Sequence, residues 1–264
     1  IYKVVDAGKQ GLETVKSFND IKTDLAMATG ENKTYINDLM QSYNALGQEL
    51  GSITSDVAQS ADSWLRQGRT MSETNQLIKD SMVLSKDAQM SSGDASNVLT
   101  STLNGFQMEA DEASNVNDVL TSLDLKSASS AQDIGEGLAK VASMSKNVGL
   151  SMEKASAIVA TSIDTTQSSG DEAGNALKGI LSRLNNIKAG KFVDSETGEA
   201  LNDTEKVLNE VGISMRDVNG QFKDSESILD TVADKWNTFD SNTQKAVATA
   251  MAGSHRINTL YAAF

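Results

Sequence analysis

Apolar residues recur along most of the chain at the three- and four-residue steps of an amphipathic α-helix. A representative face consists of Ile134, Leu138, Val141, Met144 and Val148, and Gly149 follows it directly in the sequence. Glycines and short clusters of Ser, Thr and Asp separate such faces, as expected where helices end and begin. The pattern predicts a mostly α fold, an array of short amphipathic helices.

Helix starts can be located from capping residues. Thr70-Met71-Ser72-Glu73 has the spacing of a capping box, in which the Thr hydroxyl and the Glu carboxylate each accept a backbone N–H at the start of a helix. Ser151 and Ser169 precede later apolar faces in the same way. The chain contains no proline, the residue that interrupts helices most strongly. The predicted helix stops are Gly30, Gly51, Gly68, Gly105, Gly149 and Gly190.

Two parts of the chain share a sequence pattern. Ser92-Gly93-Asp94 is repeated as Ser169-Gly170-Asp171, 77 residues later (169 − 92), and Asp56-Val57-Ala58 corresponds to Asp133-Ile134-Gly135 at the same offset. A regular offset between similar segments indicates an internal duplication, in which neighbouring copies bury their apolar faces against each other.

Four segments follow from these patterns. Residues 191–264 are predicted to form a small β-ribbon near residues 192–222 followed by C-terminal helices, because Asn219-Gly220 is a typical tight-turn pair. The chain begins with Ile1 rather than Met, so we expect a fragment of a longer polypeptide. The other segments are the N-terminal helices (1–51), the first helical pseudo-repeat (52–128) and the second (129–190).

Composition excludes most catalytic chemistry. The chain has no Cys and a single His, which excludes disulfides, thiol nucleophiles and sites built from several histidines. We therefore expect no enzymatic activity, no cofactor and no metal site. The longest uncharged runs are polar and shorter than the roughly 18 to 20 apolar residues of a membrane span, so no transmembrane segment is expected in this region.

The charge balance argues against nucleic-acid recognition. Lys and Arg total 23 against 36 Asp and Glu, a formal net charge of −13. Lys178, Arg183, Lys188 and Lys191 form a base-rich window, but steps of about five residues distribute them around a helix instead of along one stripe. Sequence-specific nucleic-acid binding, which depends on clustered bases, is therefore not expected.

Two other features have ordinary structural explanations. Gly135-Glu136-Gly137 lacks the third glycine and the preceding strand of a nucleotide-binding loop, so close helix packing explains it better. Trp64 and Trp236 fall on apolar helix faces, where a core role is favoured over a role as interface hot spots.

The order and spacing of several short motifs resemble the core region of tape-measure proteins of long-tailed phages, prophages and phage tail-like particles. The motifs include Leu25 to Gly30, Trp64 to Gly68, Ser169 to Lys178, Asp234 to Trp236 and Ala252 to Asn258. The residues of interest within them, as candidates for interaction, are Trp64, Arg66, Gly174, Asn175, Lys178, Arg183, Trp236, Arg256 and Asn258.

The resemblance implies a structural protein of the virion tail. A member of this family would be made in the bacterial host cytoplasm, lie inside the tail tube, template its length during assembly, and leave ahead of the genome to assist delivery. Its implied partners are tail tube and tail-tip proteins and tail assembly chaperones, with possible self-association. The alternative is a generic α-helical adaptor or a helical toxin subunit, and the length of the full reading frame distinguishes the two.

Overall fold

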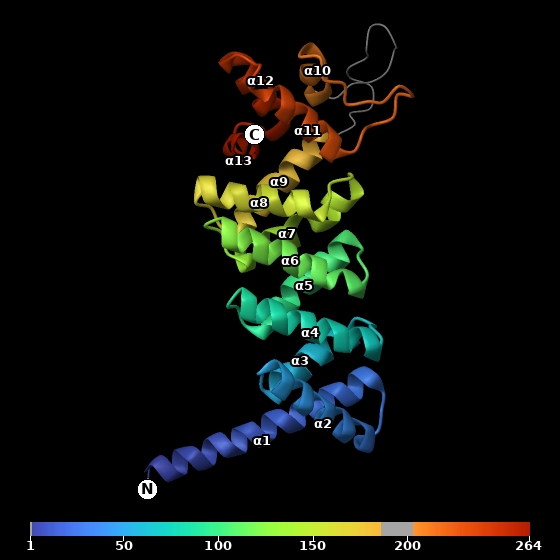
Figure 1. Ribbon diagram of the computed structural model, residues 1–264, viewed down its shortest axis with the longest axis vertical. Coiled ribbons are helices and arrows are strands. Elements are labelled where there is room, and N and C mark those ends of the chain that lie inside the picture. Colours follow the sequence, from blue (N-terminus) through green and yellow to red (C-terminus); the bar gives the residue numbers. More distant parts are fainter. Residues whose placement is uncertain (1, 186–202) are drawn as a thin grey trace. The chain divides into compact units, whose positions relative to one another are not determined.

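A computed structural model of the chain describes the backbone of residues 2–185 and 203–264 and, within these ranges, the side chains from residue 15 onward. Helices account for most of these residues (Figure 1), which confirms the expectation of a mostly α-helical fold. The chain forms two compact units. The first comprises Ile1–Leu99 and Glu109–Asn117, and the second comprises Thr100–Met108 and Asp118–Phe264.

In the first unit, α3 is central, because it packs against α1, α2 and α4. Its Trp64 is fully buried, as are Leu25 of α1 and Leu77 of α4. The elements of this unit are α1 (Tyr2–Thr29), α2 (Lys33–Leu50), α3 (Thr54–Arg66), α4 (Met71–Asp87), the start of α5 (Ser92–Phe106), the 3-10 turn η1 (Ala110–Glu112) and the start of α6 (Ala113–Lys126).

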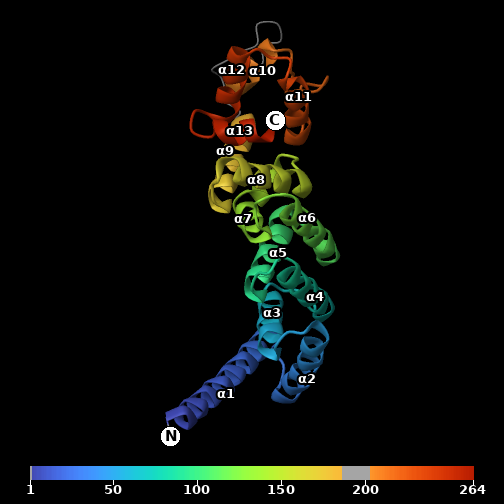
Figure 2. The same cartoon turned by 60° about the vertical axis from the view of Figure 1, so that its left-hand side comes forward.

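In the second unit, α7, α8 and α9 pack against one another, and α12 and α13 cover α9. Figure 2 shows the four C-terminal helices grouped beside α9. The helix α13 also packs on α8, where the Ser162 hydroxyl donates a hydrogen bond to Thr259 Oγ1 at 3.2 Å. The further helices are α7 (Ala131–Asn147), α8 (Met152–Thr166), α9 (Gly170–Leu184), α10 (Asp203–Glu210), α11 (Ser225–Trp236), α12 (Ser241–Ala252) and α13 (Ile257–Ala263).

The predicted caps lie where the sequence places them. Thr70 and Glu73 form the complete capping box at the start of α4. The hydroxyls of Ser151 and Ser169 accept backbone N–H groups at the starts of α8 and α9. These local signals are reliable because each satisfies backbone donors that no earlier helical turn can reach.

Four of the predicted stops are confirmed as glycines of left-handed backbone at helix ends: Gly30, Gly51, Gly68 and Gly149. The prediction for Gly105 is wrong, because α5 continues to Phe106 and Gln107 takes the left-handed conformation instead. A Cβ atom at Gly105 would overlap Ala142 of α7, so this glycine allows close packing. The predicted stop at Gly190 lies outside the described residues, and α9 already ends at Leu184.

The predicted β-ribbon is wrong for the part of residues 192–222 that the structure describes. Residues 203–210 form α10, and beyond it Arg216 and Phe222 form one isolated antiparallel bridge around the Asn219-Gly220 turn. The Asp217 carboxylate accepts the backbone N–H groups of Asn219 and Gln221, which closes the turn. The chain then reaches Asp224, the N-cap of α11, so the arms are too short for a ribbon.

Candidate functional site

The residues that carry the resemblance in the second half of the chain lie mainly on α9. Gly174 and Leu177 are buried on one face of this helix, whereas Asn175 and Lys178 are exposed on the other. The helix is held in place from both sides, by α7 and by the corner between α12 and α13.

The contact between α7 and α9 is made backbone to backbone. A Cβ atom on Gly174 would overlap the carbonyl oxygen of Gly137, and one on Gly170 would overlap that of Asp133. A Cβ atom on Gly137 would lie 2.6 Å from Cγ1 of Val159 in α8. Only glycine fits at these points, so close helix packing is the role of Gly137, as the sequence indicated.

On another side of α9, two arginines and two glycines contact each other reciprocally. A Cβ atom on Gly179 of α9 would lie 2.6 Å from Nε and 2.7 Å from Cζ of Arg256. A Cβ atom on Gly253, the C-cap of α12, would lie 2.7 Å from Nη2 and 3.0 Å from Cζ of Arg183. Each guanidinium therefore lies against the glycine of the opposite element.

Within the described part of the chain, neither guanidinium has an acidic partner. Both arginine side chains are exposed, and among the residues that the structure describes neither Arg183 nor Arg256 forms an ion pair. Arg183 lies in the last turn of α9, where the helix dipole favours a cation. Arg256 is the N-cap of α13, where the dipole disfavours one.

The other candidate residues of this unit are at the surface or in an aromatic cluster. Asn258 is exposed on α13. Trp236 is buried, and its ring centroid lies 5.0 Å from that of Phe264 and 5.8 Å from that of Tyr261. The cluster joins α11 to α13, so Trp236 helps to hold α13, and with it Arg256, in position.

The two candidates in the first unit have structural surroundings. Trp64 is fully buried, as the core interpretation expects. Arg66 pairs with Asp62 at 2.8 Å and with Asp24 at 3.2 Å, which links α3 to α1. The hydrogen bond and the charge of Asp62 raise the pKa of Arg66 above its ordinary value.

Sequence reasoning missed a buried ion pair in the second unit. Glu205 of α10 is almost fully buried, and its Oε1 accepts a 2.6 Å hydrogen bond from Nε of Arg216. The same guanidinium lies 4.3 Å from the ring centroid of Phe222 and donates to the Gly220 carbonyl. The pair fixes the turn against α10. The available signal was an acidic residue three positions before Leu208, on the apolar side of a short helix.

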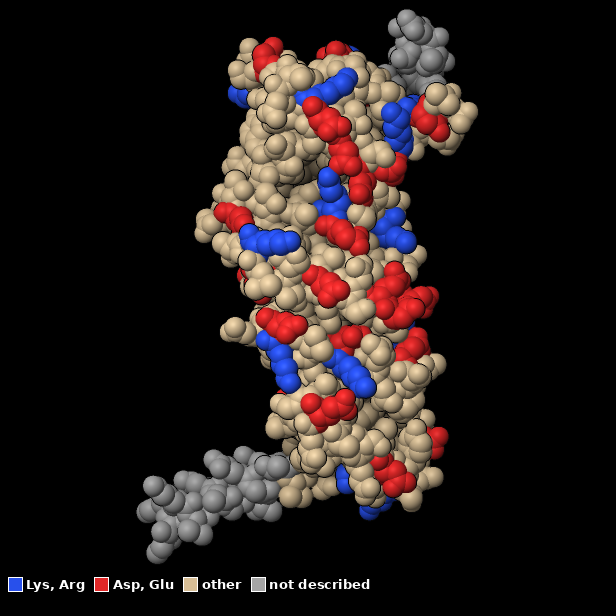
Figure 3. Space-filling view, viewed as in Figure 1, with Lys and Arg blue, Asp and Glu red and all other residues tan. Residues whose placement is uncertain are grey.

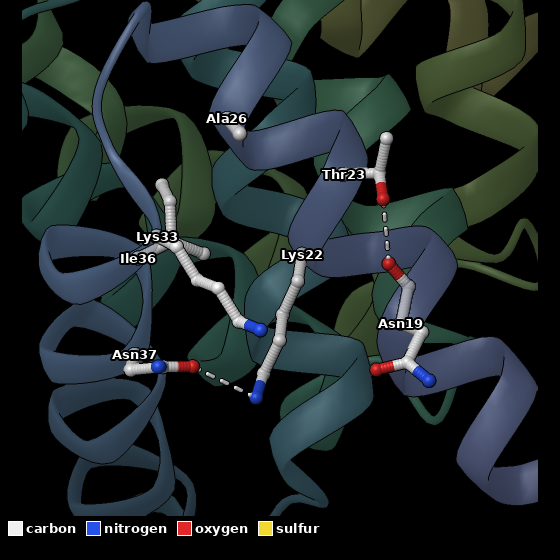
Figure 4. Close-up of a pocket in the computed structure, with 7 residues that line it drawn as sticks. All are labelled: Asn19, Lys22, Thr23, Ala26, Lys33, Ile36 and Asn37. Carbon is white, nitrogen blue, oxygen red and sulfur yellow. Dashed lines mark hydrogen bonds between the residues drawn. The ribbon is translucent and has the colours of Figure 1, made fainter.

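A groove separates α1 from α2 in the first unit (Figure 4). Its volume is about 390 Å³, and Lys22 of α1 spans it to donate a 3.0 Å hydrogen bond to Asn37 of α2. The side chains of Asn19, Thr23 and Lys33 also line it. The lining is mixed and open to solvent, and its charged groups, Lys22 and Lys33, have no acidic residue beside them in the lining, so it lacks the acid–base pair of a catalytic site.

Acidic side chains are scattered over the visible face of each unit with lysines and arginines among them (Figure 3), and no broad basic area is seen there. Within the described ranges, no three His, Cys, Asp or Glu side chains are grouped as a metal site would require. Among the same residues, none of the helices combines the length and the apolar character that crossing a bilayer demands.

The family of phage-related minor tail proteins matches residues 40–253 of the chain. The match covers most of the sequence: it begins within α2 and ends at Gly253, so it includes α3 to α12 but neither α1 nor α13. The chain therefore belongs to the phage-related minor tail protein family.

A more specific similarity points to one kind of tail protein. The chain is 30% identical over 138 residues to the tape measure protein of Pneumococcus phage Dp-1. The aligned region is 51% of this chain and 11% of that relative, so the chain spans a small part of the relative's length. The resemblance to tape-measure proteins is thus confirmed. No solved structure matches the chain significantly.

Proposed function

We propose that this chain is part of a tape measure protein, which templates the length of the tail tube during assembly and is released to assist genome delivery into the host. The observation that carries the proposal is the family match over residues 40–253 together with the similarity to a phage tape measure protein. The helical architecture supports the proposal, since the length of a helix is proportional to its number of residues, at about 1.5 Å per residue.

We also propose the location and partners that this function requires. The protein would be made in the host cytoplasm and would lie inside the tail tube, in contact with tube proteins, tail-tip proteins and assembly chaperones. The proposed role is structural, without catalysis, a cofactor or sequence-specific nucleic-acid binding. The alternative, a helical adaptor or toxin subunit, would share the fold but would not determine tail length.

Tail length is the measurement that tests the proposal. Deletion of residues 131–184 from the full-length protein should shorten the tail by about 80 Å if the segment contributes extended helix at about 1.5 Å per residue. Duplication of the same residues should lengthen it by the same amount. The matched control is substitution of the exposed Lys146 by Gln, which should leave the length unchanged. Tails of normal length after both the deletion and the duplication would overturn the proposal.

The internal duplication remains a further proposal. At the sequence offset described above, Ser60 of α3 and Ser96 of α5 correspond to Gly137 of α7 and Gly174 of α9, allowing for the extra residue Glu172. The two serines share a hydrogen bond, and the two glycines contact each other through backbone. An experimental structure tests the duplication by superposition: α3–α5 should overlay on α7–α9, and unrelated crossing angles would contradict it.

A further inference from the structure

The two longest stretches of the sequence without Asp or Glu run from Ala173 to Val193 and from Ser241 to Phe264. In the fold, their described parts pack together, because α9 contacts both α12 and α13. A chain with 36 acidic residues therefore brings its two acid-free segments into one surface, and the reciprocal contact of Arg183 and Arg256 lies within it.

The two arginines lie at the same helix crossing. Arg256 lies against Gly179, and Gly179 and Arg183 are one helical turn apart on α9, a separation of about 6 Å between neighbouring side-chain positions. Arg183 itself contacts Gly253. Two like charges at one helix crossing repel each other, and an anion beside them would offset that repulsion.

Among the described residues of this unit, no carboxylate forms an ion pair with Arg183 or Arg256. Besides α12 and α13, the helix α8 packs against both α9 and α13, and its C-terminal half carries the carboxylate of Asp164. That carboxylate forms no ion pair with either arginine. The helix dipole accounts for a cation at Arg183 but opposes one at Arg256, the N-cap of α13.

We propose that Arg183 and Arg256 form a docking site for the carboxylates of an acidic segment on a protein partner. The planar guanidinium presents paired donors that match a carboxylate, and both groups are exposed to receive one. The contact with Gly179 and Gly253 holds each guanidinium in place, which reduces the entropy lost on binding. The site adds a defined interaction surface to the proposed tape-measure role and does not depend on it.

A protein partner fits this surface better than nucleic acid. A duplex is bound through many phosphate contacts along a basic stripe, whereas this site is confined to the crossing of α9 with the corner of α12 and α13. The net charge of −13 also repels a long polyanion at low salt. A short acidic segment can reach the two arginines with fewer of its charges near the rest of the surface.

The experiment measures binding of a fluorescein-labelled hexaglutamate peptide to the 264-residue chain at low ionic strength, by fluorescence anisotropy. The variant R183Q/R256Q should weaken binding about tenfold or more, because it removes two charge-assisted contacts. The control K126Q/K146Q removes the same charge from two exposed lysines of the second unit and should weaken binding much less. The variant R183K/R256K keeps the charge without the planar donors and should lie between the two.

Equal weakening by R183Q/R256Q and K126Q/K146Q would overturn the proposal, as would failure of the unaltered chain to bind the peptide. Tighter binding of a duplex DNA of matched charge, lost in the same arginine variant, would assign the surface to nucleic acid and overturn it too. Circular dichroism checks the fold of each variant. If R183Q/R256Q does not fold, the folded R183K/R256K is compared with K126Q/K146Q. Weaker peptide binding by R183K/R256K supports the site, and binding that is no weaker overturns the proposal.

Discussion

The hydroxyl oxygens of Ser60 and Ser96 lie 2.5 Å apart in the core of the first unit, where α3 meets α5. Both residues are buried, so each hydroxyl depends on the other for its hydrogen bond across the two helices. A buried polar group that loses its partner pays its full desolvation cost, whereas removal of both partners is far less harmful.

Ser60→Ala should therefore lower the free energy of unfolding by about 1–3 kcal/mol, since it leaves the buried Ser96 hydroxyl without its hydrogen-bond partner. Ser60→Ala combined with Ser96→Ala should lose less than the sum of the two single changes. Urea denaturation of the two single variants and the double variant measures this coupling. Additive losses would show that the two hydroxyls do not interact.

The glycine contact between α7 and α9 should tolerate no side chain. Gly174→Ala places a methyl group on the carbonyl oxygen of Gly137 and should destabilise the second unit by about 1–3 kcal/mol or more. The neighbouring Asn175 is exposed, and Asn175→Ala should change stability by no more than about 0.5 kcal/mol. Thermal unfolding of both variants provides the comparison, and a stability of Gly174→Ala equal to that of Asn175→Ala would refute the backbone contact.

Gly68 and Gly149 form a matched pair for the left-handed conformation. Both have φ near +70 to +80°, so alanine at either position is strained by roughly 1–2 kcal/mol. A Cβ atom at Gly68 meets open space, whereas one at Gly149 would lie 2.5 Å from Cβ of Asp224. Gly149→Ala should therefore destabilise the protein more than Gly68→Ala, as measured by urea denaturation; equal losses would contradict the contact with Asp224.

Asp80 should make stability depend on pH in an unusual direction. Burial raises the pKa of its carboxyl group, against the opposing effect of a hydrogen bond from Gln76. The folded state thus disfavours the ionised form of Asp80. The resulting loss of stability is present above the folded-state pKa of Asp80 and disappears as the pH falls below its unfolded-state pKa. Asp80→Asn should raise the melting temperature at neutral pH and lose this advantage at acidic pH. A gain that persists unchanged at acidic pH would exclude ionisation as its cause.

The sequence allowed the local features of the fold to be predicted. Thr70, Ser151 and Ser169 mark helix starts because capping is decided within four residues, and glycines such as Gly149 mark ends because only glycine enters the left-handed region easily.

Features that depend on distant residues could not be predicted. Gly105 has the same sequence surroundings as a helix stop, and only its position against Ala142 gives it another role. The turn at Asn219-Gly220 formed, but the capping of α11 by Asp224 left no length for a ribbon. Arg183 and Arg256 were singled out individually, yet their reciprocal contacts follow from how α9 meets the corner of α12 and α13.

The hydrogen bond between Ser162 and Thr259 joins positions 97 residues apart. A pulling force on the two ends of the second unit would act on the contact of α8 with α13 before it could reach the helices enclosed between them. In the first unit, the main contacts of α3 are with α1, α2 and α4, which are near it in the chain. The contact between α8 and α13 thus closes the second unit. Under tension, these two helices would have to separate before the chain could extend fully.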